Sequence, residues 1–154
     1  KAQLLGSSSI NDANHISGPS RTGEGLYLSV QNALDEAKLQ PQQIDLINAH
    51  GTGTLYNDEM ESIAFMRANL LSAPLNSYKG YFGHTLGTSG LLETLLTIEL
   101  ARYKTLLKSL NFDTLGVSHP IKVLRTTEYK EVHYFLKTAS GFGGSNTALV
   151  IEQL

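Results

Sequence analysis

A helical segment that is apolar on almost every side constrains the fold of this chain more than any other feature. From about Thr88 to Lys104, leucine, isoleucine and alanine side chains recur around most of the circumference that a helix would have. Such a helix belongs in the interior of a protein, with other layers of structure on both sides. We therefore expect one buried core helix. Glu93 and Glu99 interrupt the segment, which is too short and too polar to span a membrane.

The remaining pattern alternates extended and helical segments, and then strands follow strands. The helical spacings run from Leu26 to Lys38 and from a cap at Asn57 or Asp58 to about Leu70. The extended segments are Ala2–Ile10, Ile44–Ala49, Pro74–Ser77, Ile121–Leu124, Val132–Ala139 and Thr147–Glu152. This order predicts an α/β fold in which a five-stranded mixed sheet has helices on both faces, one of them the core helix. The 154 residues suit one domain, residues 1–154.

Charge and motif content disfavour several kinds of function. The net charge is −2 and basic residues form no long run, so we expect no nucleic-acid partner. The five histidines show neither an i, i+4 pair nor an HExxH motif, which disfavours a metal site. The glycine run 83–90 lacks both the GxGxxG spacing and a Gly-Lys-Ser/Thr ending, so nucleotide binding is weakly supported. His15, His119 and His133 are interpreted as structural or surface residues.

The chain contains no cysteine. This excludes disulfides and thiolate metal sites, and it removes the best acyl-accepting nucleophile from this piece. The chain opens Lys-Ala-Gln, with neither an initiator methionine nor a signal-peptide pattern. We expect it to begin inside a longer protein.

Three segments place polar side chains beside glycines, at the end of a strand or the start of a helix: Asn48–Thr54, Lys79–His84 and Ser140–Asn146. Ligands bind at such positions in layered α/β folds, because strand ends present backbone donors and glycines permit close approach. His84 would lie near the N-terminus of the core helix, which favours a neutral ring that can donate from one nitrogen. From the residues alone, His50 could equally be a surface histidine, His84 a helix cap and Lys79 a solvated charge.

Taken together, the segments resemble the C-terminal half of the elongating β-ketoacyl-acyl-carrier-protein (ACP) synthases of the thiolase superfamily. The family motif HGT(G/S)T with a downstream DxxE matches His50–Thr54 and Asp58–Glu61. The motif KxxxGHxxGxxG matches Lys79–Gly90, and GFGG(S/T)N matches Gly141–Asn146. All three occur in the family's order and cover essentially the whole chain. The resemblance implies that residues 1–154 form the C-terminal domain and that a cysteine-bearing N-terminal half precedes it.

The resemblance also implies roles for individual residues in a decarboxylating Claisen condensation. His50 and His84 match the pair that hydrogen-bonds the malonyl thioester oxygen, and Lys79 matches the lysine that orients them. Glu61 matches an acidic residue that organises the loop beneath, sometimes with a bound cation or water. The residues matching those that contact the substrate or close the final turn are Thr52, Thr54, Gly141, Phe142, Gly143 and Asn146.

The same resemblance implies partners and a location. We expect an acyl carrier protein as partner, its 4′-phosphopantetheine being the only prosthetic group involved. A homodimer or heterodimer of the full-length protein, no membrane partner and a cytoplasmic location are also expected. Leu55–Asn57 and Thr138–Ser140 depart from the family pattern, so the acyl chain length and the pathway stay open. The alternatives are a non-catalytic subunit like a chain-length factor and a carrier-binding module. A hydrolase is poorly supported, because the chain has no GxSxG motif.

Overall fold

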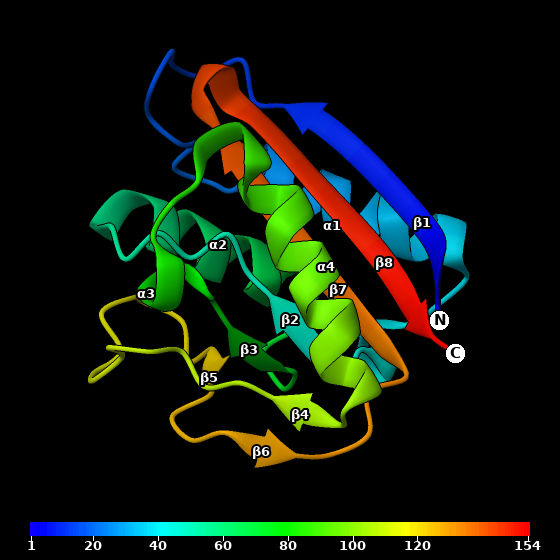
Figure 1. The fold of residues 1–154 in the computed structure, drawn as a ribbon. Helices are drawn as coiled ribbons and strands as arrows, with labels where there is room; N and C mark the ends of the chain where they lie inside the picture. Colours follow the sequence, from blue (N-terminus) through cyan, green and yellow to red (C-terminus); the bar gives the residue numbers. More distant parts are fainter.

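The computed structural model describes residues 1–154 as an α/β fold built on a mixed six-stranded sheet (Figure 1). The strand order is β1 (Ala2–Asn11), β8 (Ser145–Gln153), β7 (Tyr134–Gly141), β2 (Leu46–Asn48), β3 (Pro74–Asn76) and β5 (Lys122–Val123). β1, β8 and β7 are antiparallel neighbours, whereas β7, β2, β3 and β5 run parallel. The fold class is as expected, but the predicted count of five strands is one too low. All six extended segments join the sheet, including β5, which pairs with β3 over only two residues.

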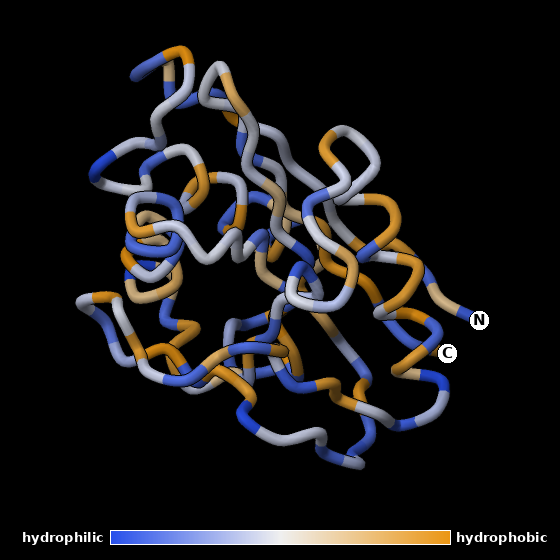
Figure 2. The backbone as a smooth tube through the Cα atoms, turned by 60° about the vertical axis from the view of Figure 1, so that its left-hand side comes forward, coloured by the Kyte–Doolittle hydropathy of each residue, from blue (hydrophilic) through white to orange (hydrophobic).

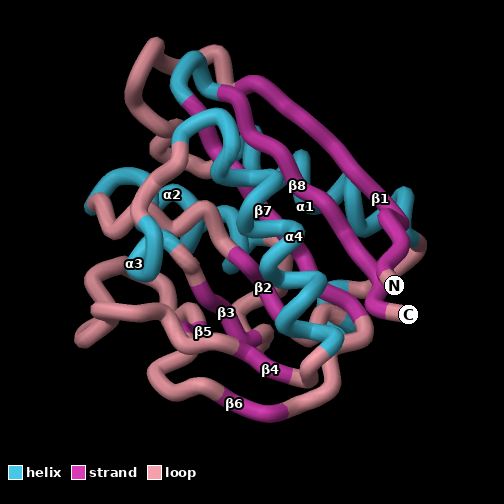
Figure 3. The backbone as a smooth tube through the Cα atoms, viewed as in Figure 1, coloured by secondary structure: helices cyan, strands magenta, loops and turns pink.

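Helices cover both faces of the sheet, as the sequence predicts (Figure 3). They are α1 (Glu24–Ala37), α2 (Leu55–Arg67), the short α3 (Lys79–Phe82) and α4 (Ser89–Arg102); β4 (Thr105–Leu106) and β6 (Glu128–Tyr129) form a separate two-stranded ribbon. α1 and α2 lie on one face and α4 on the other. None of the helices combines the length and the apolarity that a membrane crossing needs.

α2 begins earlier than expected. Its N-cap is Thr54 rather than Asn57 or Asp58, and no side chain caps the helix. The side chain of Asn57 instead donates to Oε2 of Glu61 at 3.0 Å, within the first two turns of the helix. Asn57, which looks like a helix cap in the sequence, therefore donates its hydrogen bond to a buried carboxylate.

The core lies mainly on the side of α1 and α2. A cluster of 17 buried hydrophobic residues fills the space between these helices and the sheet, and Leu26, Val30 and Ala33 of α1 are fully buried in it. The cluster on the α4 side has only seven residues. The face that carries α4 is thus the less completely packed one in this chain.

The expectation of a helix buried on both sides is wrong for α4. Leu91, Leu92 and Leu95 are 64%, 37% and 55% exposed, and hydrophobic residues recur along this helix in Figure 2. The buried side carries polar groups instead, including Glu93 and Thr97. Thr97 Oγ1 donates to the carbonyl of Glu93 at 2.7 Å, so its hydroxyl is satisfied inside the helix. In this chain α4 therefore packs against the sheet through its more polar side and leaves its leucines exposed.

The parallel strands bring the three glycine-rich segments to one edge of the sheet. β7, β2 and β3 are neighbours and run in the same direction, so their carboxyl ends meet. His50 follows β2, Lys79 follows β3, and the turn Phe142–Gly144 follows β7. The predicted location of these segments at strand ends is confirmed.

Candidate active site

His50 is held from both sides of its main chain. Its N–H donates to Oε1 of Glu61 at 2.9 Å, and its carbonyl oxygen accepts a hydrogen bond from Nζ of Lys79. The residue is 6% exposed. The imidazole therefore sits on a fixed segment of backbone at the end of β2.

His84 meets His50 directly. The two ring centroids are 5.0 Å apart and the ring planes are inclined at 79°, an edge-to-face arrangement. His84 follows α3 and Gly83, and its Nδ1 accepts a hydrogen bond from the main-chain N–H of Leu86 at 3.0 Å. Unlike His50, it is exposed. The sequence-predicted histidines are thus brought together, with one buried and one open to solvent.

Both imidazoles are neutral donors at physiological pH. Burial, reinforced by the charge of Lys79, lowers the pKa of His50 to about 3. Burial and Lys79 also lower the pKa of His84. Nδ1 of His84 accepts from Leu86, and Nδ1 of His50 faces the ammonium of Lys79 at 3.4 Å, so each ring carries its proton on Nε2. The direction of the shift in the pKa of His84 agrees with the neutral ring expected there, with burial and the charge of Lys79 as its causes.

Lys79 has an acceptor for each of its three ammonium hydrogens. They are Oε1 of Glu93 at 2.6 Å, the carbonyl oxygen of His50, and Nδ1 of His50. The Lys79 side chain is 6% exposed and that of Glu93 is fully buried. Lys79 is therefore a fixed support for His50 and not the solvated charge that the residues alone allowed.

Glu93 and Lys137 belong to the same buried cluster, and sequence reasoning missed both. Lys137 Nζ donates to Oε2 of Glu93, and Ser89 Oγ donates to Oε1 at 2.7 Å. Burial alone would raise the pKa of Glu93, but the charge and hydrogen bond of Lys137, together with Lys79, keep it below its ordinary value. The available signal was a charge in an otherwise apolar segment, in helix α4 for Glu93 and in strand β7 for Lys137.

Glu61 accepts hydrogen bonds from the main chain at His50 and Gly51. Besides His50 N–H, it accepts hydrogen bonds from Gly51 N–H at 2.7 Å, Asn57 Nδ2 at 3.0 Å and Thr138 Oγ1 at 3.2 Å. Its burial raises the pKa of the carboxyl group. These donors occupy both oxygens, so Glu61 does not fit the role of a cation ligand. No group of three or more histidine, aspartate and glutamate side chains is placed to hold a metal ion.

The two rings face a cavity of about 840 Å³ that also contains most of the remaining predicted site residues. Its walls include Thr52, Thr54, Gly141, Phe142 and Asn146. The hydroxyls of Thr52 and Thr54 are 2.8 Å apart and exposed, and Phe142 is 85% exposed.

Asn146 and Gly143 shape the turn that borders this cavity. Asn146 is buried, with Nδ2 donating to Oδ2 of Asp12 at 2.9 Å and to the carbonyl of Gly144 at 3.1 Å. Gly143 is not part of the cavity wall; it lies in the turn with φ +79°, a conformation that suits glycine.

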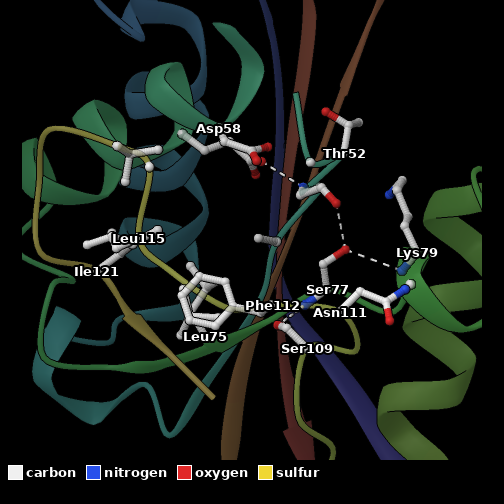
Figure 4. Close-up of a pocket in the computed structure, with 18 of the residues that line it drawn as sticks. Thr52, Asp58, Leu75, Ser77, Lys79, Ser109, Asn111, Phe112, Leu115 and Ile121 are labelled. Atoms are coloured by element: carbon white, nitrogen blue, oxygen red, sulfur yellow. Dashed lines mark hydrogen bonds between the residues drawn. The ribbon is translucent and has the colours of Figure 1, made fainter. Parts of the chain in front are cut away.

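A second cavity, of about 610 Å³, lies on the other side of the 51–54 segment (Figure 4). Thr52 and Thr54 line both cavities, but neither histidine ring lines this one. Ser77 braces its wall: Ser77 Oγ donates to the carbonyl of Gly51 at 2.7 Å, and Ser77 N–H donates to Oγ of Ser109 at 3.1 Å. Both imidazoles therefore face the larger cavity, whereas Lys79 lines the smaller one.

Comparison with known proteins connects this arrangement to one family. The family pattern described as beta-ketoacyl synthase, C-terminal domain, matches residues 1–113. The chain belongs to the β-ketoacyl synthase family. It is similar to 3-oxoacyl-[acyl-carrier-protein] synthase 2 of Rhizobium meliloti, 32% identical over 99% of this chain and 37% of the relative. It is also similar to a polyketide biosynthesis malonyl-ACP decarboxylase of Bacillus subtilis, 35% identical over 99% of this chain and 36% of the relative.

Solved β-ketoacyl synthases share the fold. A ketosynthase in complex with its chain length factor, from Xenorhabdus doucetiae, superposes with a TM-score of 0.91 at 33% identity, over 99% of this chain and 39% of that one. A type II polyketide ketosynthase in complex with its acyl-carrier protein gives a TM-score of 0.93 at 25% identity, over 99% and 38%. The chain therefore spans less than two fifths of the β-ketoacyl synthases it matches. The superposition includes β7, the Phe142 turn and β8, which lie beyond the 1–113 match.

Proposed function

We propose that the full-length protein is a β-ketoacyl-ACP synthase in which residues 1–154 form the C-terminal domain and supply the histidine pair for decarboxylation of malonyl-ACP. One observation carries the proposal: His50 and His84 adjoin at 5.0 Å, both neutral and both with a hydrogen on Nε2. Two fixed donors of this kind suit one oxygen atom on which negative charge develops.

Decarboxylation of a malonyl thioester places negative charge on an oxygen that the two neutral histidines can stabilise. When a malonyl thioester loses carbon dioxide, the electron pair of the broken carbon–carbon bond moves into an enolate and its charge collects on the thioester oxygen. Hydrogen bonds from the two Nε2 atoms stabilise that oxygen, and each such donor typically accounts for about a 10²- to 10³-fold rate increase. Lys79 and Lys137 both bind Glu93, so two ammonium groups lie behind the ring of His50.

Condensation needs a nucleophile that this chain does not contain. The enolate carbon attacks an acyl thioester and expels a thiolate, and the chain has no cysteine to hold that acyl group. The N-terminal half supplies this cysteine. It also covers the leucine face of α4, which we define as Leu91, Leu92 and Leu95. Residues 1–154 alone then have no condensing activity.

The cavity beside the histidines receives the 4′-phosphopantetheine arm of an acyl carrier protein. Thr52 and Thr54 present two adjacent hydroxyls to the arm, and Phe142, between Gly141 and Gly143, flanks the acyl end. The ketosynthase solved with its carrier protein, and the one solved with its chain length factor, support a carrier partner and a heterodimeric assembly, and the homodimer stays a prediction. The cytoplasmic location expected from the sequence stays a prediction.

A second candidate is decarboxylation of malonyl-ACP without condensation. The similarity to a malonyl-ACP decarboxylase favours it, since the groups in this chain serve that half-reaction only. A non-catalytic subunit is less well supported, because His50, His84 and Lys79 are all present, with the two rings in contact and Lys79 hydrogen-bonded to His50. A pure carrier-binding module would not require these three groups.

An assay on the full-length protein separates these candidates. Carbon dioxide release from malonyl-ACP is measured with and without acyl-ACP, alongside formation of the β-ketoacyl product. A synthase forms product; a decarboxylase releases carbon dioxide only; a subunit or binding module does neither. His84→Ala should reduce carbon dioxide release about 10²- to 10³-fold. His133→Ala, whose side chain is 66% exposed and remote from the site, serves as the control. Equal rates for the two variants would overturn the assignment of the pair.

A further inference from the structure

We propose that Lys137 is a positioning residue for the histidine pair: its ammonium binds the second oxygen of Glu93 and the carboxyl end of β2, which leaves Lys79 free to hold His50. The inference rests on the proposed function and deepens it, since it names a residue of this chain on which the geometry of the decarboxylation site depends.

Lys137 connects three elements behind the catalytic rings. Its Nζ donates to Oε2 of Glu93 on α4, and it lies 3.4 Å and 3.3 Å from the carbonyl oxygens of Asn48 and Ala49. Those two carbonyls immediately precede His50 at the end of β2. The Lys137 side chain is 2% exposed and rises from β7. A single ammonium group thus joins β7, β2 and α4 at the base of the site.

Lys137 and Lys79 bind different oxygens of Glu93. Oε1 of Glu93 receives Lys79 and Ser89, whereas Oε2 receives Lys137 alone. Glu93 is fully buried, so an oxygen left without a donor there is costly. In the absence of Lys137, Lys79 is the nearest cation that could satisfy both oxygens. It could do so only by giving up bonds to the carbonyl oxygen or Nδ1 of His50.

The charges around Lys137 lead to the same conclusion. Glu93 faces it from α4, Lys79 from α3, Glu61 from α2, and His50 from the end of β2. Burial lowers the pKa of Lys137 to about 8, with Glu93 opposing the shift, so the ammonium is charged at neutral pH. Its charge also contributes to the low pKa of His50, after burial and Lys79. Lys137 therefore supports both the position and the neutral state of that ring.

The test compares Lys137→Met with Lys130→Met in the full-length protein. Methionine keeps the length of the lysine side chain and removes its charge and donors, while Lys130 is 54% exposed on the loop before β7. For Lys137→Met we expect carbon dioxide release from malonyl-ACP to fall about 10- to 100-fold, as is typical when an outer-shell partner is lost. The fall should appear in kcat, with KM for malonyl-ACP nearly unchanged. Lys130→Met should match the unmodified protein.

A second readout does not depend on activity. In ¹⁵N-histidine NMR at pH 7, the unmodified protein should show His50 as the single Nε2–H tautomer. Lys137→Met should show a mixture of tautomers, because Nδ1 loses its fixed ammonium neighbour, whereas a purely structural role would leave the tautomer unchanged. Lys137→Gln keeps one donor for Glu93 and replaces the methionine variant if that variant does not fold.

The outcomes separate the two proposals. If the unmodified protein releases no carbon dioxide, the proposed function fails, and the NMR comparison still decides the role of Lys137. If Lys137→Met retains both the rate and the tautomer of Lys130→Met, the inference is overturned while the proposed function stands.

Discussion

The main-chain N–H of His50 donates to Oε1 of Glu61 at 2.9 Å, so a carboxylate on α2 fixes the backbone that carries a candidate catalytic ring just after β2. The neighbouring N–H of Gly51 donates to the other oxygen of Glu61 at 2.7 Å. Both donors are taken out of water by the fold, and neither has another acceptor in the structure. The position of His50 therefore depends on a side chain that need not contact a substrate.

Glu61→Ala should accordingly destabilise the protein more than Glu61→Gln. The alanine variant leaves two main-chain donors unsatisfied, at a cost of about 2–4 kcal/mol in the free energy of unfolding. Glutamine keeps one carbonyl oxygen and should lose roughly half as much. Urea unfolding of the full-length protein measures both. Glu128→Gln is the control, because Glu128 is an exposed residue of β6. Equal losses for all three variants would contradict this role of Glu61.

Gly51 and Gly53 offer a second matched comparison. Both have positive φ, +47° and +70°, so alanine is strained at either position. A Cβ on Gly51 would also lie 2.6 Å from Cβ of Ser77, whereas a Cβ on Gly53 meets nothing within 4 Å. Gly53→Ala should cost about 1 kcal/mol of stability. Gly51→Ala should cost more and should also lower decarboxylation, because the displaced loop carries His50. Similar thermal unfolding midpoints for the two variants would count against the contact with Ser77.

From the low pKa of His50 we predict that the free energy of unfolding falls as the pH is lowered. The folded pKa is about 3, against 6.5 for an ordinary histidine, so the unfolded chain binds more protons between these values. The contribution of this group to stability is therefore fully present above about pH 6.5 and is lost as the pH falls toward 3. Urea midpoints measured from pH 7 to pH 4 should fall less steeply in His50→Gln than in the unmodified protein. Parallel curves would show that His50 is not buried as the neutral ring.

The leucine face of α4 should behave oppositely in the isolated chain and in the full-length protein. In residues 1–154 alone, Leu91→Gln with Leu95→Gln should leave stability nearly unchanged and raise solubility, since both side chains are more than half exposed. In the full-length protein the same pair should destabilise by several kcal/mol, because burying a leucine contributes about 1.5–3 kcal/mol. Leu115→Gln, at a side chain that is 39% exposed outside α4, is the control. No loss in the full-length protein would mean that nothing covers this face.

Much of this molecule could be predicted from its sequence, for identifiable reasons. The strand ends at Asn48 and Asn76 and the turn at Phe142 are marked by glycines and by changes in hydropathy, and those signals are local. The pairing of His50 with His84 followed from a family resemblance and not from spacing. The strand count was one too low although all six extended segments were predicted, because local hydropathy does not show which segments pair in one sheet. Glu93 and Lys137 were missed because their partners lie far away in the chain, and periodicity does not report which distant charges will meet.

α4 carries Glu93 on its inner side and the leucine face on its outer side, so one rigid body connects the two. A partner that packs against the leucines would also fix the position and rotation of α4. It would thereby fix Glu93, to which Lys79 and Lys137 both bind. In the proposed synthase, joining the two halves and ordering the groups around His50 would then be one event. Separated halves of such a synthase would release no carbon dioxide, and so would not consume malonyl groups without making a product.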